Sequence, residues 1–314
     1  MKYDLHLHTN FSACANKNNS FEKLLTLAQK EGLENISITD HNTCIFHVIN
    51  MFMDTSLFFK GKIISGMECD VVDSGVTFEL LAYNFDIMPI FKWSFDTYGT
   101  LEIRQNRIKN KLIIIIRKHG LKFDDSIVFN GKTDYAHKYV YENLLKFDEN
   151  KWLFKTYNIQ SFNDFYRLTT TANDFLLYIN MSEFWPSVDK VIDAIHKANG
   201  IVVLAHPFNY KTDANIFLDI VLKKKIDGIE VYHQSANKKQ IKFLLDFAKK
   251  NNLIITGGSD YHGTEKHNTI GIKNIDKNQK EISLYFHKIT NLYLLFYKLK
   301  NILCWSTGFI HKRV

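Results

Sequence analysis

Short apolar runs alternate with longer segments of helical periodicity over much of the chain. Each apolar run is bounded by polar or turn-forming residues, which is the pattern of a buried strand. Between several of these runs, apolar residues recur every three or four positions, as they do in amphipathic helices. This alternation predicts a largely parallel sheet with helices packed outside it. The expected strands are 2–7, 34–39, 62–67, 77–84, 201–205, 227–232 and 253–257.

Helices are expected between these strands, at segments with suitable first and last residues. Ser20 precedes one such segment and Gly32 follows it, an arrangement typical of a capped helix. Further helices are expected over 188–200 and over 237–250, where apolar residues share one face. Seven strand and helix units fit a closed barrel better than an open sheet. We therefore expect an α/β fold, a seven-stranded (β/α)7 TIM-like barrel.

The alternation stops between about 86 and 185, where aromatic residues are dense and strand patterns are few. Helical periodicity there predicts helices over 98–120, 135–147 and 161–180. We interpret this segment as a helical insertion that covers the mouth of the barrel. The expected division of the chain is 1–85 and 186–274 for the barrel, 86–185 for the insertion, and 275–314 for a C-terminal apolar and basic helix.

Residues 282–303 near the C-terminus combine many Leu, Tyr, Phe and Ile residues with several lysines. The main interpretation is a helix packed on the barrel. The alternative is a basic amphipathic helix that lies on a membrane surface.

Composition excludes some classes of protein. With 46% hydrophobic and 23% charged residues, 314 residues can bury a large core, so disorder is not expected. The net charge of +7 permits a nucleic-acid or phosphorylated partner, but a generally basic surface explains it equally well. Four cysteines without CxxC spacing, and no apparent leader or membrane span, predict a cytoplasmic protein with reduced thiols.

Ionisable residues stand at the carboxyl end of every expected strand, where α/β barrels build their sites. His6 and His8 are two positions apart, so in a strand both imidazoles point to the same side. Buried charges are costly unless they are paired or bind metal, and histidines with carboxylates suit Zn, Mn or Fe. The candidate ligands are His6, His8, His41, Glu68, Glu79, His206, Asp260 and His262.

These motifs resemble the PHP (polymerase and histidinol phosphatase) family of metal-dependent phosphoesterases. The resemblance spans 1–85 and 185–273 and implies a distorted seven-stranded barrel, two or three divalent ions, and phosphate-ester hydrolysis by a metal-bound hydroxide. The matching segments are His6-Leu7-His8-Thr9, Ile38-Thr39-Asp40-His41-Asn42-Thr43, Gly66-Met67-Glu68, Leu204-Ala205-His206-Pro207 and Gly258-Ser259-Asp260-Tyr261-His262-Gly263.

The resemblance also implies how the ligands are shared. His6, His8, Glu68 and Asp260 would hold one ion. Glu68 would bridge to a second ion, held also by His206 and by the residue of the fourth strand. His41 and His262 would hold a third ion.

The chain departs from the family pattern at two positions. The family usually has Asp five residues after the second His, where this chain has Ala13. It usually has His at the fourth-strand position, where Glu79 stands here. Glu79 can still bind an ion, but Ala13 leaves the third ion with fewer ligands. Cys14 could supply a thiolate there, although a buried thiol is the main interpretation of Cys14.

We predict Glu68, Asp260 and His233 as catalytic residues. His233 ends a strand without being a family ligand, so it would contact the phosphate or protonate the leaving oxygen. His137, His233 and Arg107 are predicted to bind substrate, and each has the alternative of a structural or solvent-facing role. His137 opens a helix similar to a His-led helix in family members that cleave nucleotide phosphates.

The predicted function is hydrolysis of a phosphate monoester or a nucleotide-type phosphate. The partners would be a phosphorylated small molecule or a nucleotide, and short nucleic acid remains open. The alternatives are a histidinol-phosphate phosphatase and a non-catalytic metal-binding module, which the changes at Ala13 and Glu79 keep open.

Overall fold

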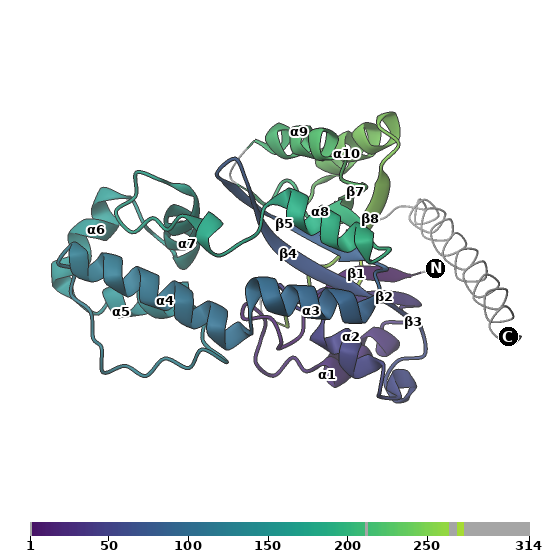
Figure 1. Cartoon of the computed structure of the whole chain (residues 1–314), viewed down its shortest axis with the longest axis horizontal. Coiled ribbons are helices and arrows are strands. Elements are labelled where there is room, and N and C mark those ends of the chain that lie inside the picture. Colours follow the sequence, from purple (N-terminus) through teal and green to yellow (C-terminus); the bar gives the residue numbers. More distant parts are fainter. Residues whose placement is uncertain (1, 211–212, 264–268, 273–314) are drawn as a thin grey trace, which may run out of the picture.

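Strands form the centre of the molecule, with helices packed on the outside (Figure 1). The structure is a computed structural model and describes residues 2–210, 213–263 and 269–272. The strands within these ranges are β1 (Tyr3–Leu7), β2 (Asn35–Ile38), β3 (Lys62–Ile64), β4 (Gly66–Asp73), β5 (Val76–Tyr83), β6 (Ile201–Leu204), β7 (Gly228–His233) and β8 (Ile254–Gly258).

Side chains cap the start of α4, α7, α9 and α10. Ser161 and Asp164 form a reciprocal capping box at the start of α7, and Asn237 and Gln240 form another at the start of α10. The helices are α1 (Phe21–Lys30), α2 (Ile45–Asn50), α3 (Ile87–Tyr98), α4 (Leu101–Lys118), α5 (Ala136–Leu144), α6 (Lys151–Thr156), α7 (Phe162–Thr171), α8 (Val188–Lys197), α9 (Ala214–Lys224) and α10 (Lys238–Lys250), with 3₁₀ turns η1 (Thr55–Leu57), η2 (Asp148–Asn150) and η3 (Met181–Glu183).

The prediction of one closed seven-stranded barrel is wrong. Within the described residues, the strands form a parallel sheet in the order β1-β2-β3 and a mixed sheet in the order β4-β5-β6-β7-β8. Isolated parallel bridges, Leu7 with Tyr261 and His41 with Glu68, bring edges of the two sheets together without a continuous ladder. The candidate ligands therefore meet where edges of the two sheets come together, not inside a closed cylinder of strands.

The physical reason for this difference lies in the run predicted as a single strand over 62–67. The chain divides at Ser65, so that β3 ends one sheet and β4 begins the other. β4 then pairs antiparallel with β5 through a two-residue turn, in which Ser74 and Gly75 both have positive φ. An antiparallel hairpin needs no crossover helix, and this breaks the parallel pattern on which a barrel depends.

The other strand predictions are confirmed to within one residue at each end. The predicted helices over 98–120 and 135–147 correspond to α4 and α5, whereas the one over 161–180 ends earlier, as α7 at Thr171. The structure adds α2, α3, α6 and α9, which the periodicity did not predict.

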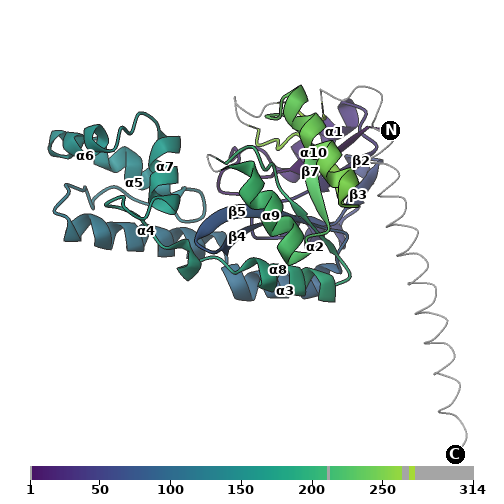
Figure 2. The same cartoon turned by 90° about the horizontal axis from the view of Figure 1, so that it is seen from above.

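Three apolar clusters hold the described residues together. The largest joins β4 to β8 with α3, α8, α9 and α10, and a second joins β1 and β2 with α1 and α2. The third lies between the helices α4, α5, α6 and α7, and Val72 of β4 is also part of it. These helices project from one end of the strand layers in both views (Figures 1 and 2). The segment predicted as a helical insertion therefore has an apolar core of its own.

The predicted C-terminal helix and its membrane contact, over 282–303, lie outside the described residues. Among the helices that the structure describes, none is long and apolar enough to cross a membrane.

Candidate metal centre

Four side chains from three separate chain segments converge at the ends of β1 and β8 and within β4. His6 Nε2 lies 3.3 Å from both Glu68 Oε2 and Asp260 Oδ1. His8 Nε2 lies 3.2 Å from Glu68 Oε2 and 3.1 Å from Asp260 Oδ1. His6, His8 and Glu68 are almost completely buried, and Asp260 is 7% exposed. Their ligand atoms all lie within 4.8 Å of one another, so one ion could contact all four.

These atoms are close together, yet they do not hydrogen bond. His6 Nε2, His8 Nε2 and Glu68 Oε2 are buried and have no hydrogen-bond partner among the described residues. Buried polar atoms without partners are costly, so their lone pairs need another partner. Lone pairs that point at a shared position, rather than at each other, are the arrangement of a metal ligand set. Imidazoles and carboxylates also suit Zn, Mn or Fe, so the residues fit a divalent ion.

A second group of ligand atoms shares Glu68 with the first. Glu68, Glu79 and His206 place their ligand atoms within 4.8 Å of one another, and His206 Nε2 lies 3.2 Å from Glu68 Oε1. Glu79 thus stands close to the position that the family resemblance implies for the fourth-strand ligand. Tyr210 holds the Glu79 carboxylate through a short hydrogen bond from its hydroxyl group. The two oxygens of Glu68 therefore face the two groups, as expected of a bridging carboxylate.

A third group comprises His8, His41 and His262. The ring of His8 stacks on that of His41 and on that of His262, with centroid distances of 4.9 and 4.2 Å, and the centroids of His41 and His262 are 6.4 Å apart. His41 Nε2 also lies 3.2 Å from Glu68 Oε2, which connects this group to the other two. All eight ligands predicted from the sequence are therefore brought into one cluster.

Further buried residues orient these ligands. Glu230, fully buried in β7, accepts a hydrogen bond from the His206 backbone at 2.9 Å and contacts His6 Nδ1 at 3.0 Å. Holding the second nitrogen of a histidine in this way directs its other nitrogen at the metal. Asp40 accepts hydrogen bonds from Thr9 and Ser12, which fixes the loop after β1.

The pKa shifts describe a cluster whose carboxylates are balanced by protons. Burial alone would lower the pKa of His206, but contact with Glu68 outweighs burial and raises it to about 9. Burial raises the pKa of Glu79 to about 7. Loss of hydration would raise the pKa of Cys14, but the neighbouring His262 and His41 outweigh it and lower the pKa to about 5. Divalent ions would replace these protons when they bind.

Two ligands have unusual backbone conformations. His206 and Asp260, which follow β6 and β8, have φ values of +21° and +53°. Positive φ is unfavourable for residues other than glycine, and such strain concentrates at functional sites. Here it turns the chain sharply at a strand end, so that both side chains face the cluster.

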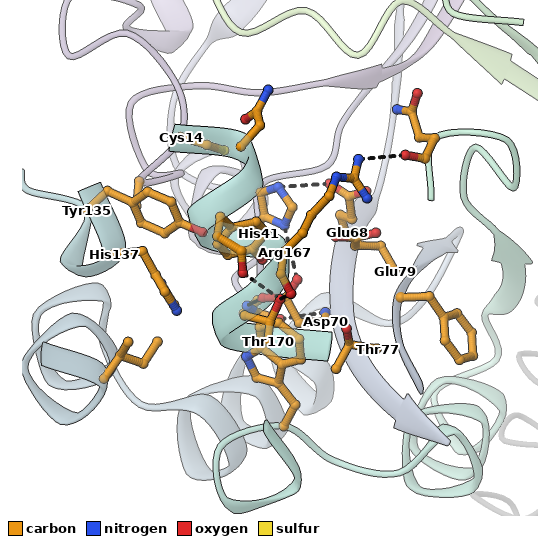
Figure 3. Close-up of a pocket in the computed structure, with 18 of the residues that line it drawn as sticks. Cys14, His41, Glu68, Asp70, Thr77, Glu79, Tyr135, His137, Arg167 and Thr170 are labelled. Carbon is orange, nitrogen blue, oxygen red and sulfur yellow. Dashed lines mark hydrogen bonds and ion pairs between the residues drawn. The ribbon is translucent and has the colours of Figure 1, made fainter. Parts of the chain in front are cut away.

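A cavity of about 410 Å³ opens beside the cluster and is lined on its outer side by the insertion (Figure 3). Tyr135, His137, Phe162 and Tyr166 line it from α5, α7 and the segments before them. Arg167 of α7 extends into it and donates from Nη2 to the backbone oxygen of Asn209 at 2.8 Å. The metal ligands His41, Glu68, Glu79, His206, Asp260 and His262 line the opposite side.

The three residues predicted to bind substrate lie in three different places relative to the cavity. His137 lines the cavity and is 1% exposed, with neither ring nitrogen hydrogen bonded among the described residues. His233 is buried behind the cluster, with Nε2 3.5 Å from Asp260 Oδ2. Arg107 is outside the cavity lining: it donates to the backbone oxygen of Glu183 and packs over Phe184.

Among the site residues, Arg167, Tyr166 and Glu230 were not predicted from the sequence. Arg167 and Tyr166 lie inside a helical segment whose pattern shows which face is apolar, but not what that face covers. Arg104 is 9% exposed and donates to the backbone oxygens of Gly99 and His41, so it holds the loop that carries His41. Glu230 could have been found, because it stands at the end of an expected strand three residues before His233.

The clustered histidines and carboxylates form a candidate centre for divalent ions. The model of the PHP domain family matches residues 4–256, and the chain belongs to this family. A curated protein of Haemophilus influenzae named 5′-3′ exoribonuclease is 25% identical over 274 residues, which cover 83% of this chain and 90% of that protein.

Two solved structures share the fold. One is a protein of Bifidobacterium adolescentis assigned to the metal-dependent phosphoesterases, with a TM-score of 0.60 and 22% identity, covering 90% of this chain and 94% of that chain. The other is an amidohydrolase of Chromobacterium violaceum with bound sulfate, with a TM-score of 0.63 and 16% identity, covering 88% of this chain and 93% of that chain.

Proposed function

We propose that this protein hydrolyses nucleotide phosphate esters, and that a 5′-phosphorylated end of single-stranded RNA is the substrate that fits best. The observation that carries the hydrolytic part is the convergence of His6 Nε2, His8 Nε2 and Glu68 Oε2 without hydrogen bonds. The nucleotide part rests on the composition of the cavity wall opposite the cluster.

The protein's own residues prepare the site for phosphate. His6, His8, Glu68 and Asp260 would hold one ion, and Glu68, Glu79 and His206 a second. When bound, such ions activate water for attack on phosphorus and neutralise charge on the phosphoryl oxygens. Glu230 and Tyr210 keep the ligands His6 and Glu79 in place. The role of His233 as a proton donor stays a prediction.

The insertion supplies the groups that would recognise a nucleotide. Arg167 uses one nitrogen for Asn209, and its remaining N–H groups have no partner among the described residues, so they are free to bind a phosphate. Tyr135, Phe162 and Tyr166 form a contiguous set of rings with centroid distances of 5.8 to 6.2 Å. Aromatic faces stack on bases with little sequence preference. A cavity of about 410 Å³ has room for a nucleotide-sized ligand.

The similarity to a protein named 5′-3′ exoribonuclease supports RNA over other phosphate esters, because it extends over most of both chains. The net charge of +7 agrees with a polyanionic substrate.

The metal mechanism is tested by His206→Ala and by chelation. Loss of a ligand of the second group should lower turnover by at least about 100-fold, since metal ligation and charge neutralisation both suffer. The matched control is His119→Ala, which removes an exposed histidine at the end of α4. Full activity in chelator-treated protein would contradict the mechanism, and bound ions without turnover on any substrate would favour a non-catalytic module.

The substrate is tested with a panel of 5′-phosphorylated and 5′-hydroxyl RNA, a 3′,5′-bisphosphonucleotide, AMP and histidinol phosphate. We expect Arg167→Ala to lower kcat/KM for the phosphorylated RNA end by about 10- to 100-fold, the value of a charged hydrogen bond. Arg117→Ala, on the exposed surface of α4, is the control. Arg107→Ala tests the remaining sequence-based prediction. Highest turnover on histidinol phosphate would overturn the nucleotide proposal.

A further inference from the structure

The loop after β1 brings a thiol to the edge of the third ligand group. Cys14 is exposed as a residue, but its Sγ contacts His262 Nε2 at 3.1 Å. Cys14 and His41 also line the same cavity. Among the described residues, Cys14 is the cysteine that lies at the cluster, because Cys44 and Cys69 are buried elsewhere.

The ring nitrogens of three histidines at this end of the cluster lie close enough together to bind one ion. His8 is fully buried, and its ring stacks on those of His41 and His262. Its Nε2 has no hydrogen-bond partner among the described residues, and neither has Nδ1 of His41. The ligand atoms of the three histidines lie within 4.8 Å of one another. The close approach of these three imidazoles indicates a site for an ion at this end of the cluster. His8 Nε2 also faces Glu68 and Asp260 of the first ligand group, so His8 belongs to both groups.

The loop holds Cys14 in place from both sides. Before it, Ser12 Oγ donates to Asp40 at 2.6 Å and accepts from the His41 backbone at 3.0 Å. After it, the backbone N–H of Asn16 donates to the backbone oxygen of His262 at 2.9 Å. The loop is therefore fastened to the same segments that carry His41 and His262, and the sulfur is positioned before any ligand binds.

We propose that Cys14, His41 and His262 are protein ligands of a zinc ion, with the Cys14 thiolate in the place where Ala13 provides no ligand. Thiolate and imidazole together are a common donor set for Zn²⁺. On binding, the Zn–S bond forms as the proton shared by Cys14 and His262 passes to the solvent. The proposal rests on the metal centre of the proposed function, but not on its substrate.

Cobalt substitution tests the thiolate directly. Co²⁺ bound to a thiolate absorbs in the near ultraviolet through charge transfer, whereas Co²⁺ bound by imidazoles and carboxylates alone does not. We expect this band in the wild-type protein, its loss in Cys14→Ala, and its retention in the control Cys44→Ala. We also expect Cys14→Ala to hold about one zinc ion fewer per chain. A wild-type protein without the band, or an unchanged band in Cys14→Ala, would overturn the proposal.

A second variant and a second readout make the test independent of folding and of catalysis. Cys14→Ser nearly preserves shape, and it should lose the band while keeping the wild-type melting temperature. In mass spectrometry after iodoacetamide treatment, zinc should protect Cys14 from alkylation, and equal alkylation with and without zinc would contradict zinc ligation. Wild-type protein that binds no ions at all contradicts the whole metal centre, whereas equal ion counts in wild type and Cys14→Ala contradict the third site alone.

Discussion

At the scale of single residues, the metal centre is governed by which ligands carry protons. The pKa of His206 is raised to about 9 by Glu68, and that of Glu79 is raised to about 7 by burial. Both groups must lose a proton before they bind a metal ion. The apparent metal affinity should therefore rise as the pH increases from 7 to 9, and level off above that range.

Calorimetric titration with Zn²⁺ or Mn²⁺ in buffers of different ionisation enthalpy measures this proton release. The number of protons released per bound ion should fall between pH 7 and pH 9, while the affinity for the ion rises. An affinity that is independent of pH over this interval would show that the two groups are not deprotonated on binding.

His137 provides a different kind of proton balance, because it is not a ligand. Burial lowers its pKa from 6.5 to about 3, so the folded protein keeps it neutral where the unfolded chain protonates it. Its contribution to stability is complete above pH 6.5 and is lost as the pH falls toward 3. Between pH 7.5 and pH 5, the loss amounts to about 2 kcal/mol.

The variant His137→Phe removes this titration and keeps an aromatic ring beside Tyr135 and Tyr166. Urea unfolding of both proteins at the two pH values should show the variant gaining about 2 kcal/mol relative to wild type on acidification. A difference that stays constant with pH would mean that His137 is not held neutral in the folded protein.

At the scale of elements, the site depends on how closely β8 approaches β1. A Cβ atom at Gly258 would lie 2.2 Å from the Cβ of His6 and 2.5 Å from its backbone nitrogen. Backbone cannot move aside as a flexible side chain can, so Gly258→Ala should separate the strands that carry His6 and Asp260.

We expect Gly258→Ala to lower the melting temperature strongly and to abolish binding of the first ion, as measured by calorimetry and metal analysis. Gly120→Ala is the matched control. It introduces the same methyl group where no atom lies within 4 Å, so its cost is limited to a positive φ of 67°. Equal effects of the two substitutions would mean that close packing of β1 and β8 does not determine the site.

At the scale of the whole molecule, the helical segment 101–184 within the predicted insertion is joined at both of its ends to strand β4. Before it, the Tyr98 hydroxyl donates to the backbone oxygen of Asp70, and after it, the N–H of Val72 donates to the backbone oxygen of Pro186. Both attachment points lie within two residues of one strand. Its helices also have their own apolar core, to which Val72 contributes.

Replacing 101–184 with a short Gly-Ser linker should therefore leave the first two ion groups intact. We expect the shortened protein to bind these ions and to hydrolyse a small phosphate ester, but to lose its preference for phosphorylated RNA ends because Arg167 and the aromatic wall are gone. Metal analysis and the substrate panel measure the two parts separately. Retained preference for RNA would show that recognition resides in the strand layers.

Strand positions, strand pairing and site residues could be predicted from the sequence to different extents. Strand positions were predicted well, because buried strands need continuous apolar runs that do not depend on their neighbours. The closed barrel was wrong, because the division at Ser65 and the turn at Ser74–Gly75 decide which strands pair, and pairing is a long-range property. The cluster of candidate ligands could be predicted, because its residues lie within or directly after apolar runs that can be found one by one along the sequence.

The directions of side chains on helices could not be predicted in this way. Arg107 and Arg167 both lie on helices of the insertion, and only Arg167 reaches the cavity. Their helices show the same kind of periodicity, so the direction of each side chain depends on how α4 and α7 pack against the strand layers.

The sequence by itself determined which side chains could meet as candidate ligands: each imidazole or carboxylate at the centre follows or lies within an apolar run that forms a buried strand. It also determined membership of the PHP domain family, since the motifs that carry the resemblance are local. Only the tertiary structure decided that two sheets meet at the cluster, that Arg167 and the aromatic wall face it, and that Cys14 lies beside His41 and His262. These contacts join residues far apart in the chain, and their energies arise from packing and pairing that no local pattern records.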